Sequence, residues 1–275
     1  MVQLKSIIEK AYEEHYAIGA FNFYNLESGQ ALAEASNVAG KPIIMMVTEA
    51  TVDYAGLDFI CNIFDTLNKQ SKTKLFLHLD HGKNIELIKE CIVRKFDSVM
   101  FDGSAQPFEQ NSIISSELRK MAHRRGVVFE AEIGKIGGRE DNVSSEFFKT
   151  NPSEALRFYE LVKPDMLAVA IGNIHGQRTT AEHLDFSLLA KIQNTINAPI
   201  VLHGCSGRTA REYSVAIAEG VVKINIDTEL REAFTSSVKR SVRKETDPRK
   251  ILGSAREDIK KRALEKIKIF SKPCC

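Results

Sequence analysis

Three histidines stand at the ends of apolar runs in three separate parts of the chain. They are His81 in LFLHLDHG, His175 in LAVAIGNIHG and His203 in PIVLHG, and each is followed at once by glycine. Imidazole is the commonest metal ligand in proteins, and three histidine ligands with an open position suit a catalytic zinc ion. Asp80 precedes His81, and a carboxylate beside a Lewis acid is well placed to transfer protons. These residues predict a metal-assisted reaction.

Apolar runs of strand length alternate with helical patterns along the chain. The expected strands are 18–22, 43–47, 75–80, 98–102, 127–132, 167–171, 199–203 and 222–226. Helical periodicity covers 26–39, 85–95, 109–125, 152–162, 184–196 and 209–219. Eight strands alternating with helices predict an α/β fold, a (β/α)8 TIM barrel. A doubly wound open sheet is the alternative, but it usually opens on a Gly-rich turn, which IGAFNFYN lacks.

Two further helices are expected outside the eight repeats. Residues 1–16 have an amphipathic pattern, and the charged stretch 250–270 forms a C-terminal helical extension. Because no low-complexity linker divides the chain, residues 1–275 are predicted to form a single barrel domain.

Every expected strand ends in a polar residue. Active sites of TIM barrels lie at the carboxyl ends of the strands, so these residues are candidates for one site. They are Asn22, Thr48, Asp80 with His81, Asp102, Glu132, His175 beyond the sixth strand, His203, and Asn225 with Asp227.

Carboxylates on neighbouring strands suggest a further cation position. Glu130 and Glu132 point to the same side of their strand, because they are two residues apart. Glu132 and Asp102 are interpreted as additional metal ligands or an alternative position for the ion, and Glu130 as part of a salt bridge inside the barrel. His78, two residues before Asp80, is expected to support the site rather than bind the metal.

Two glycine-rich segments suggest how a substrate is held. HGCSGRT, residues 203–209, joins a strand to a helix and offers Ser206 near the helix N-terminus, which predicts a phosphate site. Its place after the seventh strand, facing Asn225, strengthens this reading. The polar segment 134–146 is interpreted as a loop that closes over the site, with a solvated surface turn as the alternative.

Composition excludes several classes of protein. The net charge of +2 argues against a nucleic-acid-binding surface, and no apolar run has membrane-spanning length. The N-terminus lacks the apolar core of a signal peptide. Five cysteines without a C-x-x-C pair argue against a disulfide framework and favour a reducing, cytoplasmic setting.

Six motifs in order resemble the class II, metal-dependent ketose-bisphosphate aldolases. They are GAFNFYNLE, HLDHG, AEIGKIGGREDNV, AIGNIHG, LHGCSG and KINIDTEL, and they span nearly the whole chain. The resemblance implies a cleavage of fructose 1,6-bisphosphate to dihydroxyacetone phosphate and glyceraldehyde 3-phosphate through a zinc-stabilised enediolate. A glycolytic enzyme acting on a small phosphorylated sugar is expected.

The resemblance also implies a role for each matching residue. His81, His175 and His203 match the ligands of Zn²⁺, and Glu132 and Asp102 match a position for a second divalent or a monovalent cation. Asp80 matches the acid/base at the C4 hydroxyl, and Glu140 the carboxylate that exchanges a proton at the enediolate carbon. The implied substrate-binding residues are Asn22, Thr48, Gly176, Gly204, Ser206, Asn225, Asp227 and Thr228, with Arg249 or Arg256 at the distal phosphate.

Alternatives remain within and outside this family. The related substrate is tagatose 1,6-bisphosphate or another phosphorylated ketose, and Asp227 favours the fructose form because the tagatose-type enzymes have Ala there. A non-catalytic sugar-phosphate-binding barrel is the alternative of a different class, and the presence of all three histidines with Asp80 and Glu140 argues against it. The distal arginine often comes from a neighbouring subunit in the family, so a homodimer or homotetramer is expected.

Overall fold

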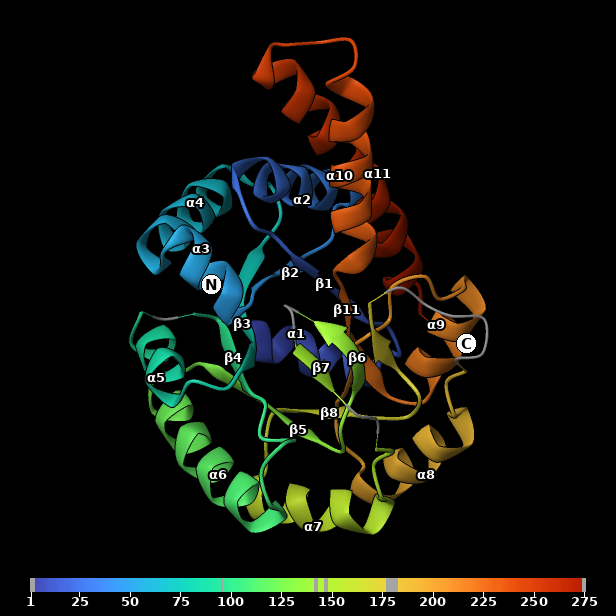
Figure 1. The fold of residues 1–275 in the computed structure, drawn as a ribbon. Coiled ribbons are helices and arrows are strands. Elements are labelled where there is room, and N and C mark those ends of the chain that lie inside the picture. Colours follow the sequence, from blue (N-terminus) through green and yellow to red (C-terminus); the bar gives the residue numbers. More distant parts are fainter. Residues whose placement is uncertain (1–2, 95, 141–142, 146–147, 177–182, 274–275) are drawn as a thin grey trace.

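The computed structural model describes residues 3–94, 96–140, 143–145, 148–176 and 183–273. Eight parallel strands close into a barrel in the order β1-β11-β10-β8-β5-β4-β3-β2. Pairing of β1 with β11 closes the ring, with Ala20 opposite Asn225 and Phe21 opposite Ile226. The expected (β/α)8 TIM barrel is confirmed (Figure 1).

The barrel strands coincide closely with the apolar runs of the sequence. Their bounds are β1 Ile18–Asn22, β2 Ile43–Val47, β3 Leu75–Gly82, β4 Ser98–Phe101, β5 Val128–Ile133, β8 Met166–Val169, β10 Ile200–Leu202 and β11 Val221–Ile226. Almost all residues in these strands are buried, because one face lines the barrel and the other packs on helices.

Helices surround the barrel in the described part of the chain. They are α1 Leu4–Glu13, α2 Leu26–Ala39, α3 Glu49–Ala55, α4 Leu57–Gln70, α5 Ile85–Val93, α6 Phe108–Arg124, α7 Pro152–Val162, α8 Phe186–Ile196, α9 Ala210–Ala218, α10 Thr228–Ser241 and α11 Pro248–Phe270. Side-chain caps mark several starts. Asn25 accepts the amide of Ser28 at α2, and Thr209 forms a capping box with Glu212 at α9. None of these helices combines the length and apolar character that crossing a bilayer requires.

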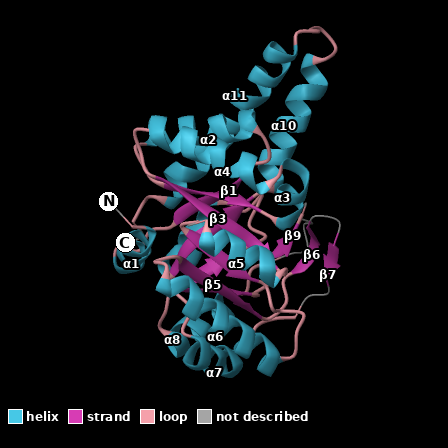
Figure 2. Cartoon of the chain, turned by 90° about the vertical axis from the view of Figure 1, so that its left-hand side faces the viewer, coloured by secondary structure: helices cyan, strands magenta, loops and turns pink. Residues whose placement is uncertain are grey.

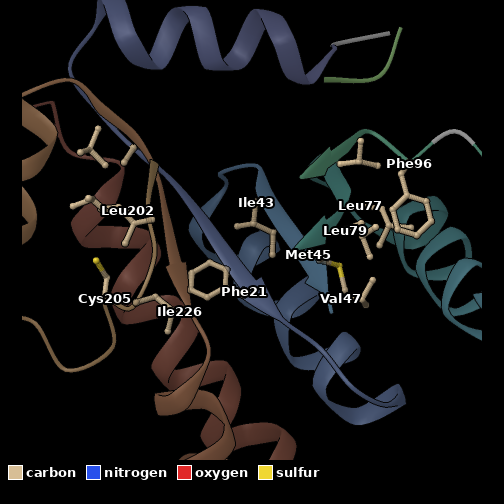
Figure 3. Close-up of a cluster of buried hydrophobic side chains, with 14 of the residues drawn as sticks. Phe21, Ile43, Met45, Val47, Leu77, Leu79, Phe96, Leu202, Cys205 and Ile226 are labelled. Atoms are coloured by element: carbon tan, nitrogen blue, oxygen red, sulfur yellow. The ribbon is translucent and has the colours of Figure 1, made fainter. Parts of the chain in front are cut away.

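Two apolar layers hold the strands in place. On the outer faces, residues such as Phe21, Met45 and Leu79 pack against the helices, and Figure 3 shows part of this layer. Inside, the half of the barrel near the strand starts is filled by an apolar cluster. Its buried members are Ile18, Ala20, Ile44, Met46, Phe76, Met100, Val128, Met166, Ala168, Val201 and Val222, with Leu4, Ile8 and Ala11 of α1.

Additional elements lie at the two ends of the barrel. The N-terminal helix α1 packs on the apolar end, opposite a small sheet at the other end (Figure 2). That sheet contains β6 Gly137–Glu140, β7 Val143–Ser145 and β9 Ile174–His175, in the order β7-β6-β9. The segment 134–146, interpreted as a loop that closes over the site, therefore contains strands in its described residues, and its closure stays a prediction. Its composition indicated a loop, but pairing with the distant Ile174 and His175 supplies strand partners.

The C-terminal extension is a pair of helices. α10 and α11 pack together and project beyond the barrel, and α11 returns along α2 to its end near β1 (Figures 1 and 2). The expected extension is confirmed, although α10 starts earlier in the chain than the expected charged helix.

Candidate active site

The three histidines meet at the carboxyl end of the barrel. His81 belongs to β3, His175 to β9, and His203 follows β10 directly. The ring centroids of His81 and His203 lie 4.5 Å apart and those of His81 and His175 4.9 Å apart. One ring nitrogen from each lies within 4.8 Å of the others. Segments as far as 122 residues apart in the chain thus bring three imidazoles to one point.

An unusual backbone conformation aims His81. Its φ of +47° lies in the left-handed region, although it is not at a helix end. Gly82 follows it, and a Cβ there would lie 2.7 Å from the carbonyl oxygen of Met100, so only glycine fits. Beyond it, one carboxylate oxygen of Glu49 accepts the amides of Lys83 and Asn84 at 2.7 and 2.6 Å. The segment is therefore fixed directly after the strained residue.

His203 is oriented by a buried ion pair below it. Nε2 of His203 lies 2.8 Å from Oε1 of Glu130, and Oε2 of Glu130 lies 2.9 Å from the ammonium of Lys223. Burial alone would raise the pKa of Glu130, but Lys223 and His203 lower it to about 2. Glu130 is therefore ionised and accepts the Nε2 proton, which leaves the lone pair on Nδ1 facing the other histidines. The expected internal salt bridge of Glu130 is confirmed.

Asp80 lies beside the histidines on the inner face of β3. Its Oδ1 accepts the amide of Asn225 at 3.0 Å and lies 3.6 Å from Nε2 of His78 and 3.8 Å from Nδ1 of His203. Burial would raise the pKa of Asp80, but His81, His78 and His203 outweigh it and hold that pKa well below its ordinary value. Burial and Lys223 lower the pKa of His78, so its ring is neutral and supports Asp80 from below.

A second group of possible ligands lies on the other side of His81. Nδ1 of His81 is 3.4 Å from Oδ2 of Asp102 and 3.8 Å from Oε2 of Glu132, and the three residues each offer a ligand atom close enough to the others for one cation. Ser104 donates its hydroxyl to Asp102 at 2.6 Å. Burial would raise the pKa of Asp102, but His81 and Ser104 lower it, so the group is anionic. The structure thus brings together both sets of metal candidates expected from the sequence.

A pocket opens next to the histidines. It includes most of the residues expected to bind substrate. The lining residues are Asn22, Asp80, His175, Gly176, Gly204, Cys205, Ser206, Asn225, Asp227, Thr228 and Arg231. Gly204 has φ +57°, and a Cβ there would lie 2.6 Å from the backbone of Ile174, so the loop approaches β9 as only glycine allows. Buried Oδ1 atoms of Asn22 and Asn225 have no hydrogen-bond partner among the described residues and are available to a ligand.

Asp227 adds an acidic group at the pocket wall. Its Oδ2 lies 2.6 Å from the guanidinium of Arg231, and its buried Oδ1 has no partner in the part of the chain that the structure describes. The side chain is only 14% exposed, and burial raises its pKa to about 6 despite Arg231. Asp227 can therefore change its protonation state near neutral pH.

Four of the expected residues lie elsewhere or outside the described part. Thr48 caps α3 by accepting the amide of Thr51 and does not line the pocket. Arg249 is 89% exposed and pairs with Asp247 at the start of α11, while Arg256 donates to Gln30. The side chain of Glu140 lies outside the described residues, so its role stays a prediction.

Two further residues at the site were not predicted from the sequence. Arg231 lines the pocket, and its spacing of four from Asp227 on a helix was the available signal. Asn173 is fully buried, and its amide donates to the carbonyls of Val169 and His203 at 3.2 and 3.1 Å. Nothing local in the sequence marks this link between two strand ends.

Fold and site define a barrel enzyme with a metal-ligand cluster beside a small polar pocket. The family model for class-II fructose-bisphosphate aldolase matches residues 2–273. The chain belongs to this family and is an aldolase, a carbon–carbon lyase acting on ketose bisphosphates. Members of this family are generally metal-dependent, in agreement with the two ligand groups.

Solved structures agree with this assignment. The YdjI aldolase from Escherichia coli K12 is 29% identical, with a TM-score of 0.86 over 99% of this chain and 98% of its own. A protein assigned as a fructose-1,6-biphosphate aldolase from Coccidioides immitis is 25% identical, with a TM-score of 0.88 over 98% and 96%. The fructose-bisphosphate aldolase of Campylobacter jejuni, 22% identical over 97% and 93% with a TM-score of 0.83, supports the fold alone.

Proposed function

We propose that this aldolase reversibly cleaves fructose 1,6-bisphosphate to dihydroxyacetone phosphate and glyceraldehyde 3-phosphate with Zn²⁺ at His81, His175 and His203. The observation that carries the proposal is the convergence of these three imidazoles beside Asp80, at the edge of the polar pocket. The substrate is a small phosphorylated sugar, and the enzyme works as a homodimer or homotetramer.

The tautomers of the histidines suit a cation. Nδ1 of His203 lies 2.8 Å from Nε2 of His81, while their other ring nitrogens face Glu130 and Asp102. Because those carboxylates take the ring N–H groups, two lone pairs face each other, and a shared cation relieves their repulsion. Asn225 also donates toward Nδ1 of His203 at 3.1 Å, as expected for an acceptor nitrogen. When bound, Zn²⁺ supplies Lewis-acid stabilisation of the enediolate charge.

Asp80 takes the role of acid/base. Its carboxylate is anionic at neutral pH and accepts the proton of the C4 hydroxyl as the C3–C4 bond breaks, giving the aldehyde. The amide of Asn225 holds the accepting oxygen in place. Glu140 is proposed to return a proton to C3 of the enediolate. In the direction of synthesis both residues act in reverse.

The pocket suits the phosphate end of dihydroxyacetone phosphate. Gly204 and Ser206 present backbone amides and a hydroxyl before α9, and Gly176 and Thr228 line the same cavity. The distal phosphate is proposed to meet Arg249 of a neighbouring subunit, because Arg249 is solvent-exposed near the tip of the projecting helix pair and not part of this pocket. Asp102 and Glu132 are the proposed holders of a second divalent or a monovalent cation.

Substrate choice is proposed to rest on Asp227. Fructose and tagatose bisphosphates differ only at C4, and the open Oδ1 of Asp227 can accept a substrate hydroxyl. A site built around such a bond penalises the wrong configuration. We expect a higher kcat/KM for fructose 1,6-bisphosphate, and a preference reduced about tenfold or more in Asp227→Ala, the worth of a hydrogen bond to a charged group.

Measuring kcat/KM for both sugars on both proteins tests the substrate. A wild-type preference for tagatose 1,6-bisphosphate, or an unchanged ratio in Asp227→Ala, would refute the role of Asp227 and leave the aldolase assignment. Ser206→Ala is the control. It should raise KM for both sugars alike, because the phosphate at the dihydroxyacetone-phosphate end is the same in both.

A further inference from the structure

The phosphate loop, residues 203–209, is fixed from behind by three side chains that do not line the pocket. Oε1 of Glu229 accepts the backbone amide of Gly207 at 2.6 Å. The hydroxyl of Tyr213 donates to the backbone carbonyl of Cys205 at 2.7 Å. Both contacts act on the peptide groups that flank Ser206, so they set where that residue sits.

Lys266 of α11 joins the two contacts. Its ammonium lies 3.0 Å from Oε1 of Glu229, 3.4 Å from the hydroxyl of Tyr213 and 5.0 Å from the centre of the Tyr213 ring. The side chain is only 5% exposed, and burying an ammonium is costly unless it is paired. The buried ammonium of Lys266 therefore holds the carboxylate of Glu229 and the hydroxyl of Tyr213 in one arrangement.

The helix that carries Lys266 is itself firmly held. Phe270, one turn further, stacks edge-to-face on Tyr213 with centroids 4.8 Å apart, and its carbonyl accepts the amide of Ala17 before β1. α11 therefore connects the start of the barrel with the loop after β10, and it packs against α9 and α10 on the way (Figure 1).

We infer that Lys266, Glu229 and Tyr213 are positioning residues that hold the loop 203–209 in the geometry that binds a phosphate group. The inference rests on the proposed function only in taking that loop as the phosphate subsite. It gives the C-terminal helix a part in substrate affinity, although α11 contributes no side chain to this pocket.

The test is Lys266→Met, with Lys268→Met as the matched control on the exposed face of the same helix. In Lys266→Met the inhibition constant of inorganic phosphate and the KM for fructose 1,6-bisphosphate should rise by about tenfold, because misplaced binding groups lose affinity steeply. kcat should stay within about twofold and the zinc content unchanged, because the histidines and Asp80 are untouched. Lys268→Met should resemble the wild type in every measurement.

Two further variants keep the inference falsifiable if Lys266→Met folds poorly. Tyr213→Phe removes only the hydroxyl that holds Cys205, and it should weaken phosphate binding by about threefold, the worth of one neutral hydrogen bond. Glu229→Gln with Lys266→Met removes both charges but keeps an acceptor for Gly207, and it should restore most of the affinity.

Direct calorimetry with inorganic phosphate separates this inference from the proposed function. A wild type that binds phosphate but does not cleave fructose 1,6-bisphosphate would contradict the proposed substrate and leave the inference standing. Unchanged phosphate affinity in folded Lys266→Met and Tyr213→Phe would overturn it. A parallel fall in kcat and zinc content would also overturn it, since that would mean a general disturbance of the barrel.

Discussion

The two ends of the barrel interior differ in chemistry although the same strands build both. Along the inner face of β3, the buried Phe76 is followed by His78 and then Asp80, and β5 changes in the same way from Val128 to Glu130. The apolar end is sealed by α1, whereas the polar end opens into the pocket. On the inner face of a single strand, a step of two residues thus separates the apolar side chains that stabilise the barrel from the polar side chains at the site.

Metal removal should have the largest effect on the polar end. A chelator is expected to remove about one Zn²⁺ per chain and abolish cleavage, and zinc or cobalt should restore it. Circular dichroism of the metal-free protein should keep the barrel signal, because the apolar end does not depend on the ion. Full activity after verified metal removal would contradict the zinc proposal.

Asp80→Ala should separate chemistry from metal binding. We expect kcat to fall by roughly 10²–10⁴-fold, the usual worth of a positioned acid/base, with zinc content unchanged. The control is Asp53→Ala on α3, which lies away from the pocket. A near-normal kcat in Asp80→Ala would assign the proton transfer to another group.

Phe76 lies four residues before Asp80 on the same strand. Phe76→Ala should lower stability and leave kcat almost unchanged, the opposite of Asp80→Ala. Truncating this fully buried ring should lower the free energy of unfolding by about 3–5 kcal/mol, measured by urea denaturation. The kcat of the folded fraction should change little. Phe59→Ala, at a ring that is 70% exposed, is the control and should be nearly neutral. A loss of kcat with no loss of stability would break the division between the two ends.

The smallest effect concerns pH and Asp227. Burial raises the pKa of this carboxyl to about 6, so it is anionic above pH 6 and protonated below it. The preference for fructose over tagatose bisphosphate should fall on the order of fivefold as pH drops through 6, because a neutral acid makes a weaker acceptor. In Asp227→Ala the ratio should not vary with pH. Taking the ratio cancels ionisations that both sugars share.

The positions that were predicted best from the sequence are those fixed by the alternation of side chains along a strand. His78 and Asp80 could be placed on one face from their spacing, and the ends of β3 and β10 placed His81 and His203 at one rim. Contacts between distant segments could not be read in this way. The amide of Asn173 reaches the carbonyl of His203 only because the barrel closes.

Two regions show why the remainder needed the structure. The glycine-rich composition of β6 indicated a loop, and pairing with β7 and with the distant β9 makes it a strand. Glu229 and Lys266 read as ordinary charges on helical surfaces, since charged residues are usually exposed. Their burial follows from the packing of α11 beside the loop after β10. Long-range packing, not local pattern, decided these positions.

The left-handed backbone of His81 sets stability against function at a single residue. The other described non-glycine residues with positive φ, His15, Lys163 and Asn197, follow helices, where such conformations are common. His81 adopts it within a strand, at a cost of roughly 1 kcal/mol for a residue with a side chain. Glycine there would suit the backbone better and remove the ligand. Stability of the fold therefore favours glycine at this position, whereas the proposed metal site needs histidine, and the chain has histidine.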